Sequence, residues 1–376
     1  MSKNKKLLIG VDASRSVSGI EKTGVEKVSD ELLSTINKQL STINNGDVDF
    51  IFYAPKIIEW LPESKHRIFG TKRLWTVLGL SFEMLRNKPD VLFVPVHTLP
   101  FFCPKRTVKI IHDIAFVENK QAYSFWQRMY LNFDLWRCAR ICEKIIVPTE
   151  KVKKDLLKYT GVNEDKIVVI KWGYNTKALK HLNTETLKHV DDEIYRRKQI
   201  LYLGRVEEKK NIFNLIKGFE IFNKKYGDYK LILAGKAGKF PISNFQFPNN
   251  SQIKNSKFKI QNSKFLGYIS DEEKYKLLQE SSCLVLVSKD EGFGIPILEA
   301  FDFELPVLAS DIPALREVGK EACMYVDPNN PESIAQGLDK IAKDNGLREK
   351  LISKGRERLK KFNWETSLKK VLDVLL

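Results

Sequence analysis

The chain has 376 residues, of which 43% are hydrophobic and 29% charged, and this balance excludes a disordered or collagen-like protein. Because one hydrophobic core seldom serves so long a chain, we expect two domains. The formal net charge of +16 divides into +9 for residues 1–175 and +7 for the remainder, so no basic tail or arm carries it.

Five cysteines are scattered along the chain, too few for a disulfide framework and without the paired spacing of a zinc site. The longest apolar tract, residues 91–103, is interrupted by prolines and is too short to span a membrane. The sequence therefore predicts a cytoplasmic protein without a transmembrane segment.

Short β-branched runs alternate with amphipathic stretches through the first half, as is typical of doubly wound α/β proteins. The predicted helices cover residues 24–37 and 127–142. The predicted strands are 6–11, 49–53, 91–95, 107–111, 144–148 and 167–170.

The second half repeats the alternation. Helices are predicted at residues 212–224, at 271–280 and from 331 onward. The predicted strands are 199–203, 230–234, 264–266, 283–287 and 306–309. The fold class is therefore α/β, with two Rossmann-like domains and a ligand cleft between them.

Two segments break the pattern. Residues 174–198 are polar and charge-rich and are the predicted linker between a domain at 1–173 and a domain at 199–355. Residues 238–263 repeat Asn, Ser and Lys and are expected to form a mobile surface insertion.

The strongest local signal is the run DEGFGIPILEA, residues 290–300. It follows a predicted strand, and Pro296 is expected at the first position of a new helix. Glycines in such a turn let the backbone approach a ligand, and the helix start offers N–H groups to a phosphate. With Glu291 and Glu299 at its two ends, the run suits a ligand that carries both hydroxyls and phosphate; a solvated turn is the plain alternative.

A second signal follows the predicted strand at 199–203. Arg205 and Lys210 converge on a strand-to-helix turn, which suits a diphosphate, and Asn211 is the expected N-cap of the next helix. Taken alone this is a solvated basic turn. Its occurrence in one α/β domain with the run at 290–300 is more specific than either part.

These residues carry a family resemblance that covers essentially the whole chain. The runs EGFGIPILEA (291–300) and PVLASDIPALREV (306–318) resemble the E-x7-E signature of the family 4, or group 1, retaining glycosyltransferases, which have the two-domain GT-B fold. The segments LYLGRVEEKKN (201–211), VDASRSVSGIEKTGVEKV (11–28) and IIHDIAF (110–116) resemble other parts of that family. FNWETSLKKVL (362–372) resembles its tail helix, so residues 356–376 are expected to cross back onto the first domain.

The resemblance implies a role for each matching residue. Arg205 and Lys210 would neutralise the diphosphate of a nucleotide-sugar donor, Glu299 would accept hydrogen bonds from its ribose, and Glu291 would face its hexose. The remaining candidates are backbone amides at Gly292, Phe293 and Gly294, the loop glycine Gly24, and His112 at the donor sugar. Retaining transfer without a metal or other cofactor is the implied reaction.

Some features depart from the family pattern or point elsewhere. Residues 303–305 read Phe-Glu-Leu where the family usually has small residues, which leaves the geometry of that turn in doubt. Asp47 and Asp49 form a DxD pattern, which we interpret as a solvated turn and not as a metal site. The aromatic stretch 123–136 has helical spacing and is expected to be core or acceptor groove, not a platform for stacked bases.

The resemblance favours a mannosyltransferase-like branch, with GDP-mannose before a UDP-sugar as donor and a glycan or lipid-linked saccharide as acceptor. Two alternatives stay open: a basic nucleic-acid-binding α/β protein, and a GT-B isomerase or hydrolase of nucleotide sugars. Nucleic acid is not the expected partner, because the charge is spread evenly. A peripheral contact with the inner face of the membrane through the basic segments 65–73 and 151–158 is a further hypothesis.

Overall fold

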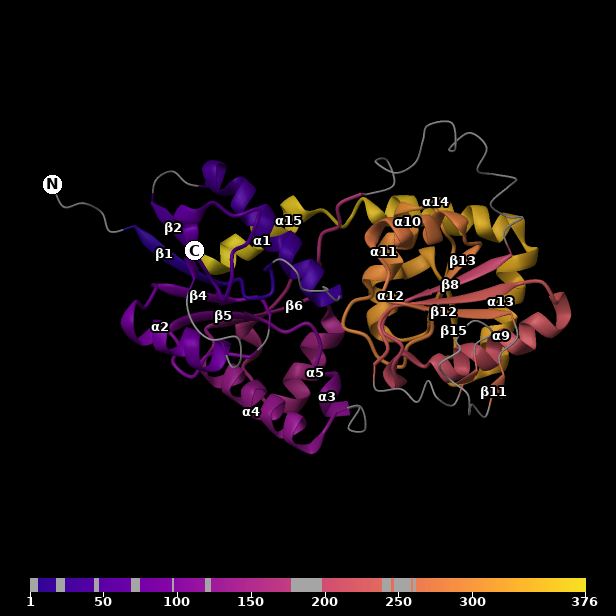
Figure 1. Cartoon of the computed structure of the whole chain (residues 1–376), viewed down its shortest axis with the longest axis horizontal. Coiled ribbons are helices and arrows are strands. Elements are labelled where there is room, and N and C mark those ends of the chain that lie inside the picture. The colour runs from indigo at the N-terminus through magenta and orange to yellow at the C-terminus, as the bar shows by residue number, and fades with distance from the viewer. Residues whose placement is uncertain are drawn as a thin grey trace. The chain divides into compact units, whose positions relative to one another are not determined.

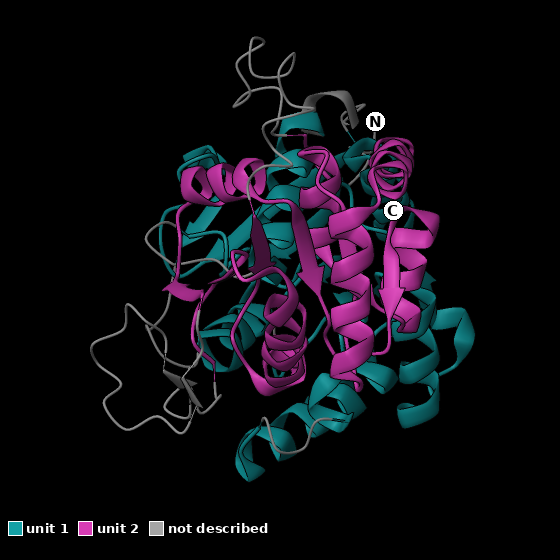
Figure 2. Ribbon diagram, turned by 90° about the vertical axis from the view of Figure 1, so that its right-hand side faces the viewer, with its two compact units in different colours: residues 1–173, 362–376 teal, residues 174–361 magenta. Residues whose placement is uncertain are grey.

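The computed structural model describes residues 6–17, 24–43, 47–68, 75–96, 98–118, 123–176, 198–238, 245–246, 258–259 and 262–376. The chain divides into two compact units: unit 1 comprises residues 1–173 and 362–376, and unit 2 comprises residues 174–361 (Figure 2). Most of the predicted linker at 174–198 and of the predicted insertion at 238–263 lies outside the described residues. The cleft expected between the domains stays a prediction.

Unit 1 is built on a seven-stranded parallel sheet with the strand order β3-β2-β1-β4-β5-β6-β7. The central strands are buried on both faces, which explains why they read as continuous apolar runs. The strands are β1 Leu7–Asp12, β2 Val48–Ala54, β3 His66–Ile68, β4 Val91–Val94, β5 Arg106–Ile110, β6 Lys144–Val147 and β7 Ile167–Val169.

Helices cover both faces of this sheet, with α1 and α15 on one face and α4 and α5 on the other (Figure 1). Local capping residues set both ends of helix α5. The Thr149 side chain accepts a hydrogen bond from the Val152 amide at its start, and the helix ends at Gly161, whose backbone is in the left-handed region. The helices are α1 Gly24–Ile43, α2 Ser81–Arg86, α3 Ala115–Glu118, α4 Phe125–Ile141 and α5 Glu150–Thr160, with a π-helical turn at Trp75–Leu80 and 3-10 turns at Glu63–Lys65 and Glu164–Lys166.

Unit 2 has a six-stranded parallel sheet with the order β12-β9-β8-β13-β14-β15. Its strands are β8 Gln199–Leu203, β9 Lys230–Ala234, β12 Ser263–Gly267, β13 Cys283–Leu286, β14 Val307–Ser310 and β15 Met324–Val326. Two short strands, β10 Phe245–Gln246 and β11 Phe258–Lys259, pair with each other apart from this sheet.

In unit 2, helices α10, α11 and α14 lie on one face of the sheet and α9 and α13 on the other (Figure 1). Helix α10 begins at a capping box, in which Ser270 and Glu273 satisfy each other's backbone amides. The helices are α9 Ile212–Tyr226, α10 Asp271–Glu280, α11 Ile295–Asp302, α12 Pro313–Gly319, α13 Pro331–Lys343 and α14 Asn345–Leu359, with 3-10 turns at Glu208–Lys210 and Lys320–Ala322.

The last helix, α15 (Trp364–Leu375), packs in unit 1, as expected for the tail. The Trp364 indole donates to Glu31 Oε2 at 2.9 Å, and Ser367 Oγ donates to the Lys171 carbonyl at 2.7 Å. The expected start at residue 356 is wrong, because α14 continues to Leu359 and a new helix is capped by the Asn363 side chain.

Both sheets have a point at which the strand order reverses. In unit 1 it lies between β1 and β4, and in unit 2 between β8 and β13. Ligands of doubly wound folds bind at the carboxyl ends of the strands flanking such a point. Asp47 and Asp49 lie at the opposite, amino end of β2 and are exposed, which fits a solvated turn.

Candidate functional site

The turn after β8 depends on two close backbone segments. Gly204 and Gly235, which follow the neighbouring strands β8 and β9, have φ angles of 148° and 144°. A Cβ on Gly235 would lie 2.0 Å from the Gly204 carbonyl oxygen, so only glycine fits there. Arg205 comes next, half exposed, with its Nε 3.5 Å from Glu207. The turn therefore presents the arginine at the carboxyl end of β8.

Lys210 and Glu291 are brought together from the ends of β8 and β13. Lys210 Nζ lies 2.6 Å from Glu291 Oε1, and Ser288 Oγ donates to the same oxygen at 2.8 Å. Both charged side chains are largely covered, at 16% and 11% exposed. The Glu291 carboxylate is therefore held in a fixed orientation, with one lysine and one hydroxyl on a single oxygen.

Asn211 occupies the N-cap position of α9, but not with the expected contact. Its φ is 58°, and its side chain accepts nothing from the helix. Instead, its amide nitrogen donates to the Val287 carbonyl at 3.0 Å and to the Pro328 carbonyl at 2.6 Å. Asn211 thus ties the turn after β8 to the end of β13, and its predicted N-cap position is confirmed, without a side-chain capping bond.

The loop from Glu291 to Gly294 leads directly into α11. Gly294 has a φ of 102°, and a Cβ there would lie 2.7 Å from a methyl of Leu315. Phe293 is buried beside it, and Gly294 is the N-cap. Pro296 is therefore the second helical residue, not the first as predicted. The start of α11 offers amides to an anion at the carboxyl end of β13.

Glu299, one turn into α11, is held by a lysine that the sequence did not single out. Lys274 Nζ, from α10, lies 2.5 Å from Glu299 Oε1 and 3.1 Å from Asp271. Burial alone would lower the pKa of Lys274, but the Glu299 carboxylate raises it above its usual range, so the lysine stays charged. Each of the two signature carboxylates therefore has its own lysine.

The turn at residues 303–305, which departs from the family pattern, lies directly after α11. Glu304 has a φ of 56°, and Phe303 stacks on Tyr275 of α10 with ring centroids 5.5 Å apart. Arg356 of α14 holds the Glu304 carboxylate at 2.5 and 2.6 Å. The larger side chains are thus accommodated by packing and an ion pair.

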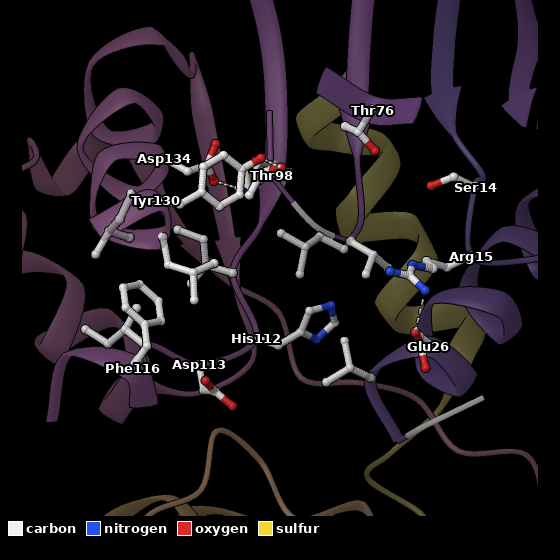
Figure 3. Close-up of a pocket in the computed structure, with 18 of the residues that line it drawn as sticks. Ser14, Arg15, Glu26, Thr76, Thr98, His112, Asp113, Phe116, Tyr130 and Asp134 are labelled. Carbon is white, nitrogen blue, oxygen red and sulfur yellow. Dashed lines mark hydrogen bonds and ion pairs between the residues drawn. The ribbon is translucent and has the colours of Figure 1, made fainter. Parts of the chain in front are cut away.

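Unit 1 contains a cavity of about 740 Å³ at the carboxyl ends of its central strands (Figure 3). One wall carries Arg15 and Glu26, whose charged groups are 3.4 Å apart. Another carries the Tyr130 and Thr98 hydroxyls, which share a hydrogen bond of 2.7 Å. Phe116 adds an aromatic wall, so the cavity combines polar groups with rings.

His112 points into the centre of this cavity (Figure 3). Its Nε2–H donates a hydrogen bond to the Pro95 carbonyl at 3.0 Å, and its ring lies 5.4 Å from that of Trp172. Burial lowers the pKa of His112, so the ring is neutral near pH 7. With Nε2 protonated, Nδ1 is the acceptor nitrogen. Gly24 is the first residue of α1, with open space where a Cβ would stand.

A buried ion pair lies at the base of the cavity. Lys109 Nζ of β5 and Asp134 Oδ2 of α4 are 2.5 Å apart, each 7% exposed. Asp134 Oδ1 also accepts from the Leu99 amide at 2.8 Å. The pair joins a sheet strand, a helix and the loop after β4. Sequence reasoning missed it, because no motif marks either residue.

The predicted site residues thus fall into two groups. Unit 2 brings together Lys210 and Glu291 and places Arg205, Gly292, Phe293, Gly294 and Glu299 on the turns and helix around them. His112 and Gly24 belong to unit 1. Lys274 and Ser288 are additional polar contacts within the first group.

Comparison with known proteins identifies the chain. A family model described as "Glycosyl transferases group 1" matches residues 184–358, and one described as "Glycosyltransferase Family 4" matches residues 53–178. The chain belongs to the group 1 glycosyltransferases. It is therefore an enzyme that transfers a glycosyl group.

Two curated relatives of this glycosyltransferase are bacterial mannosyltransferases. It is 24% identical to O-antigen chain mannosyltransferase B of Escherichia coli, over 91% of this chain and 93% of that protein. It is 27% identical to O-antigen chain mannosyltransferase RfbU of Salmonella typhimurium, over 73% of this chain and 66% of that one.

Solved structures show the same fold. Anabaena HepE in complex with UDP-glucose superposes with a TM-score of 0.70 at 14% identity, over 98% of each chain. The lipopolysaccharide glycosyltransferase WaaG gives 0.69 at 15% identity, over 98% of this chain and 99% of that one. The GT-B architecture predicted from the sequence is confirmed. Within the described residues, no helix is both long enough and apolar enough to cross a bilayer.

Proposed function

We propose that this glycosyltransferase moves a hexose, with mannose as the first candidate, from a nucleoside diphosphate sugar to a glycan or lipid-linked saccharide. The proposed reaction retains the anomeric configuration and uses no metal. The observation that carries the proposal is the meeting of Lys210, Glu291 and the start of α11 at the switch point between β8 and β13. The mannosyltransferase relatives support the sugar, and the UDP-glucose complex of HepE supports a nucleotide-sugar donor.

The charges at this point suit a diphosphate. Lys210 carries three N–H donors and uses one on Glu291, and Arg205 stands exposed on the same turn. The α11 amides add a partial positive charge on the β13 side. As the glycosidic bond breaks, negative charge grows on the diphosphate, and donors already in position stabilise it without reorganisation.

The two carboxylates are proposed to bind hydroxyl groups at opposite ends of the donor. Glu299 is oriented by Lys274 through one oxygen, which leaves the other to accept from ribose hydroxyls. Glu291 is likewise held through Oε1 by Lys210 and Ser288, which leaves Oε2 for the hexose. In this arrangement Lys210 and Lys274 fix the orientation of the two carboxylates.

In unit 1, His112 is proposed to contact a sugar hydroxyl through Nδ1, because Nε2 is committed to the Pro95 carbonyl. In this tautomer the neutral ring accepts a hydrogen bond from the sugar hydroxyl through Nδ1, and it is not an acid catalyst for the reaction. Gly24 at the start of α1 is proposed to allow its loop to approach the diphosphate. The rest of the cavity, with its tyrosine, threonine and arginine, is the proposed acceptor site.

We propose that the enzyme works in the cytoplasm, and at the inner face of the membrane when its acceptor is lipid-linked. The thiols of all five cysteines are free, which suits a reducing compartment.

The test is a thermal-shift screen with GDP-, UDP- and ADP-sugars, followed by transfer to a saccharide acceptor with the anomeric product read by NMR. We expect stabilisation by one nucleotide class and α-linked product from an α-linked donor. Turnover that persists in EDTA supports the metal-free reaction. Consumption of donor without any acceptor product would instead identify a hydrolase or isomerase.

A further inference from the structure

Helix α4 buries polar side chains and exposes aromatic ones to solvent, the opposite of the usual amphipathic helix. Its polar residues Asp134 and Arg137 are buried, at 5% and 8% exposed, whereas Trp126 and Trp136 are 71% and 52% exposed. The buried polar groups are satisfied, since Asp134 binds Lys109 and Arg137 donates to the carbonyls of Pro100 and Phe101 at 2.8 and 3.0 Å. The expectation that stretch 123–136 forms core or groove is therefore wrong for its solvent face.

The exposed residues form a continuous aromatic surface. Phe125 and Trp126 make an edge contact with ring centroids 5.4 Å apart, and Phe133 stacks on Trp136 at 6.1 Å. The aromatic surface is defined by the exposed residues of α4, Phe125, Trp126, Met129, Phe133 and Trp136, together with Phe101 and Phe102.

Helix α2 adjoins this surface. The Phe101 amide donates to Ser81 Oγ at 2.7 Å, so the loop with Phe101 and Phe102 lies between α2 and α4. On α2, Phe82 and Leu85 are also more than half exposed, at 53% and 57%. Figure 1 shows α2 and α4 along the same lower edge of unit 1.

The charges on the aromatic surface are positive. Arg140 lies 4.0 Å from the centroid of the Trp136 ring, and Arg86 lies 4.2 Å from that of Phe82. The one carboxylate of α4, Asp134, is buried against Lys109. The surface thus combines aromatic rings with arginines whose charge is open to an anionic partner.

We propose that the aromatic surface docks on a lipid bilayer that contains anionic headgroups. Tryptophan rings favour the boundary between headgroups and acyl chains, and arginines beside them pair with anionic lipid. The 17 residues of α4 make a rod of about 25 Å that can lie in the membrane plane. A second copy fits less well, because a two-fold interface would face these arginines with their own like charges.

The aromatic surface is distinct from the basic segments 65–73 and 151–158, for which membrane contact stays a prediction. In the segment 151–158, Lys151 pairs with Asp155 at 2.8 Å and Lys153 with Glu164 at 2.7 Å. In the segment 65–73, whose residues 69–73 lie outside the described part of the chain, Arg67 pairs with Glu83 at 2.9 Å. Lys151, Lys153 and Arg67 are thus already matched by carboxylates of the protein.

The proposal goes beyond the glycosyl transfer and is measured without any sugar. The full chain is mixed with phosphatidylcholine vesicles, with or without 50% phosphatidylglycerol, and sedimented. We expect binding to the anionic vesicles, weakened at least tenfold by Trp126→Ser with Trp136→Ser, and about fivefold by Arg140→Ala. All three side chains are exposed, so circular dichroism should show an unchanged fold.

A matched control lies on α9 of unit 2, where Lys217 stands 4.2 Å over the exposed Phe213 ring with the same spacing of four residues. The pair Phe213→Ala and Lys217→Ala should leave vesicle binding unchanged, whereas Trp136→Ala and Arg140→Ala should reduce it. Absence of binding by the wild type, equal binding to neutral vesicles, or equal effects of the two pairs would overturn the proposal. Self-association lost with Trp136→Ala, without vesicle binding, would assign the surface to a second copy instead.

Discussion

The two sheets carry carboxylates at equivalent switch points but treat their charge differently. In unit 2, Glu291 and Glu299 are each paired with a lysine at 2.6 and 2.5 Å. In unit 1, Asp12 ends β1 with 3% of its surface exposed, and its Oδ2 has no hydrogen-bond partner among the described residues. The signature carboxylates of unit 2 are therefore each matched by a cation, whereas unit 1 leaves one oxygen of a buried carboxyl group without a hydrogen-bond partner among the described residues.

The largest expected effect concerns the ion pair that supports the unit 1 cavity. Asp134→Ala leaves Lys109 buried without its partner and removes the acceptor of the Leu99 amide, so the free energy of unfolding should fall by about 3–5 kcal/mol. Urea denaturation followed by circular dichroism measures this.

The double variant Asp134→Leu with Lys109→Met is the control for that loss. It removes both charges together and should recover most of the stability, apart from the Leu99 hydrogen bond. A double variant as unstable as Asp134→Ala would show that packing, and not the buried charge, holds the cavity together.

In unit 2, breaking the ion pair between Lys210 and Glu291 should reduce catalysis and leave folding little changed. Lys210→Ala removes a donor to the proposed diphosphate and the partner of Glu291, so transition-state stabilisation should fall by about 2–4 kcal/mol, seen in kcat/KM. Arg205→Ala should act in the same direction. Lys209→Ala is the neighbouring control, since Lys209 lies 3.6 Å from Glu207 and has no proposed donor contact. Near-normal transfer by Lys210→Ala would contradict the diphosphate assignment.

The secondary structure of the two units was only partly predictable from the sequence. Strands β8 and β9 and helix α10 begin and end where the sequence pattern places them, because their apolar periodicity and turn residues agree. Short elements such as β3 and β15 were missed, since three residues carry too little pattern and neighbouring strands decide their pairing.

Contacts across the chain were harder to predict. Resemblance named Lys210 and Glu291, but their 2.6 Å contact spans 81 residues and follows from the adjacency of β8 and β13. The Lys274 contact with Glu299 has no sequence signal. In α4 the helical period was visible, but period alone does not say which face is buried, and here tertiary ion pairing draws the polar face inward.

Asp12 supplies a pH test of the same contrast. Burial raises its pKa to about 6 from 3.8, against the lowering effects of the Ser14 amide, Arg15 and Lys109. A carboxyl group with a raised folded-state pKa stabilises the fold most below about pH 4, and that stability is lost as the pH rises through 6. The shift corresponds to about 3 kcal/mol, so Asp12→Asn should remove a decline of that size between pH 4 and pH 7.

Asp311→Asn is the control for Asp12, because Arg316 lowers the pKa of that exposed carboxyl group and the sign of its small effect is opposite. Urea denaturation of both variants over this pH range gives the comparison. A parallel pH profile for Asp12→Asn and the wild type would show that Asp12 is already solvated or paired.

The smallest expected effect distinguishes the role of Glu299 from that of Glu291 through the kinetic effects of removing their lysine partners. Lys274 orients Glu299, which is proposed to bind the ribose, a part of the donor that does not change during bond breaking. Lys274→Ala should therefore weaken ground state and transition state equally, raising KM for the donor about fivefold while kcat stays near the wild-type value. Lys210→Ala should lower kcat instead. If Lys274→Ala lowers kcat with unchanged KM, Glu299 acts at the reacting end of the donor, and the proposed orientation of the nucleotide along α11 is reversed.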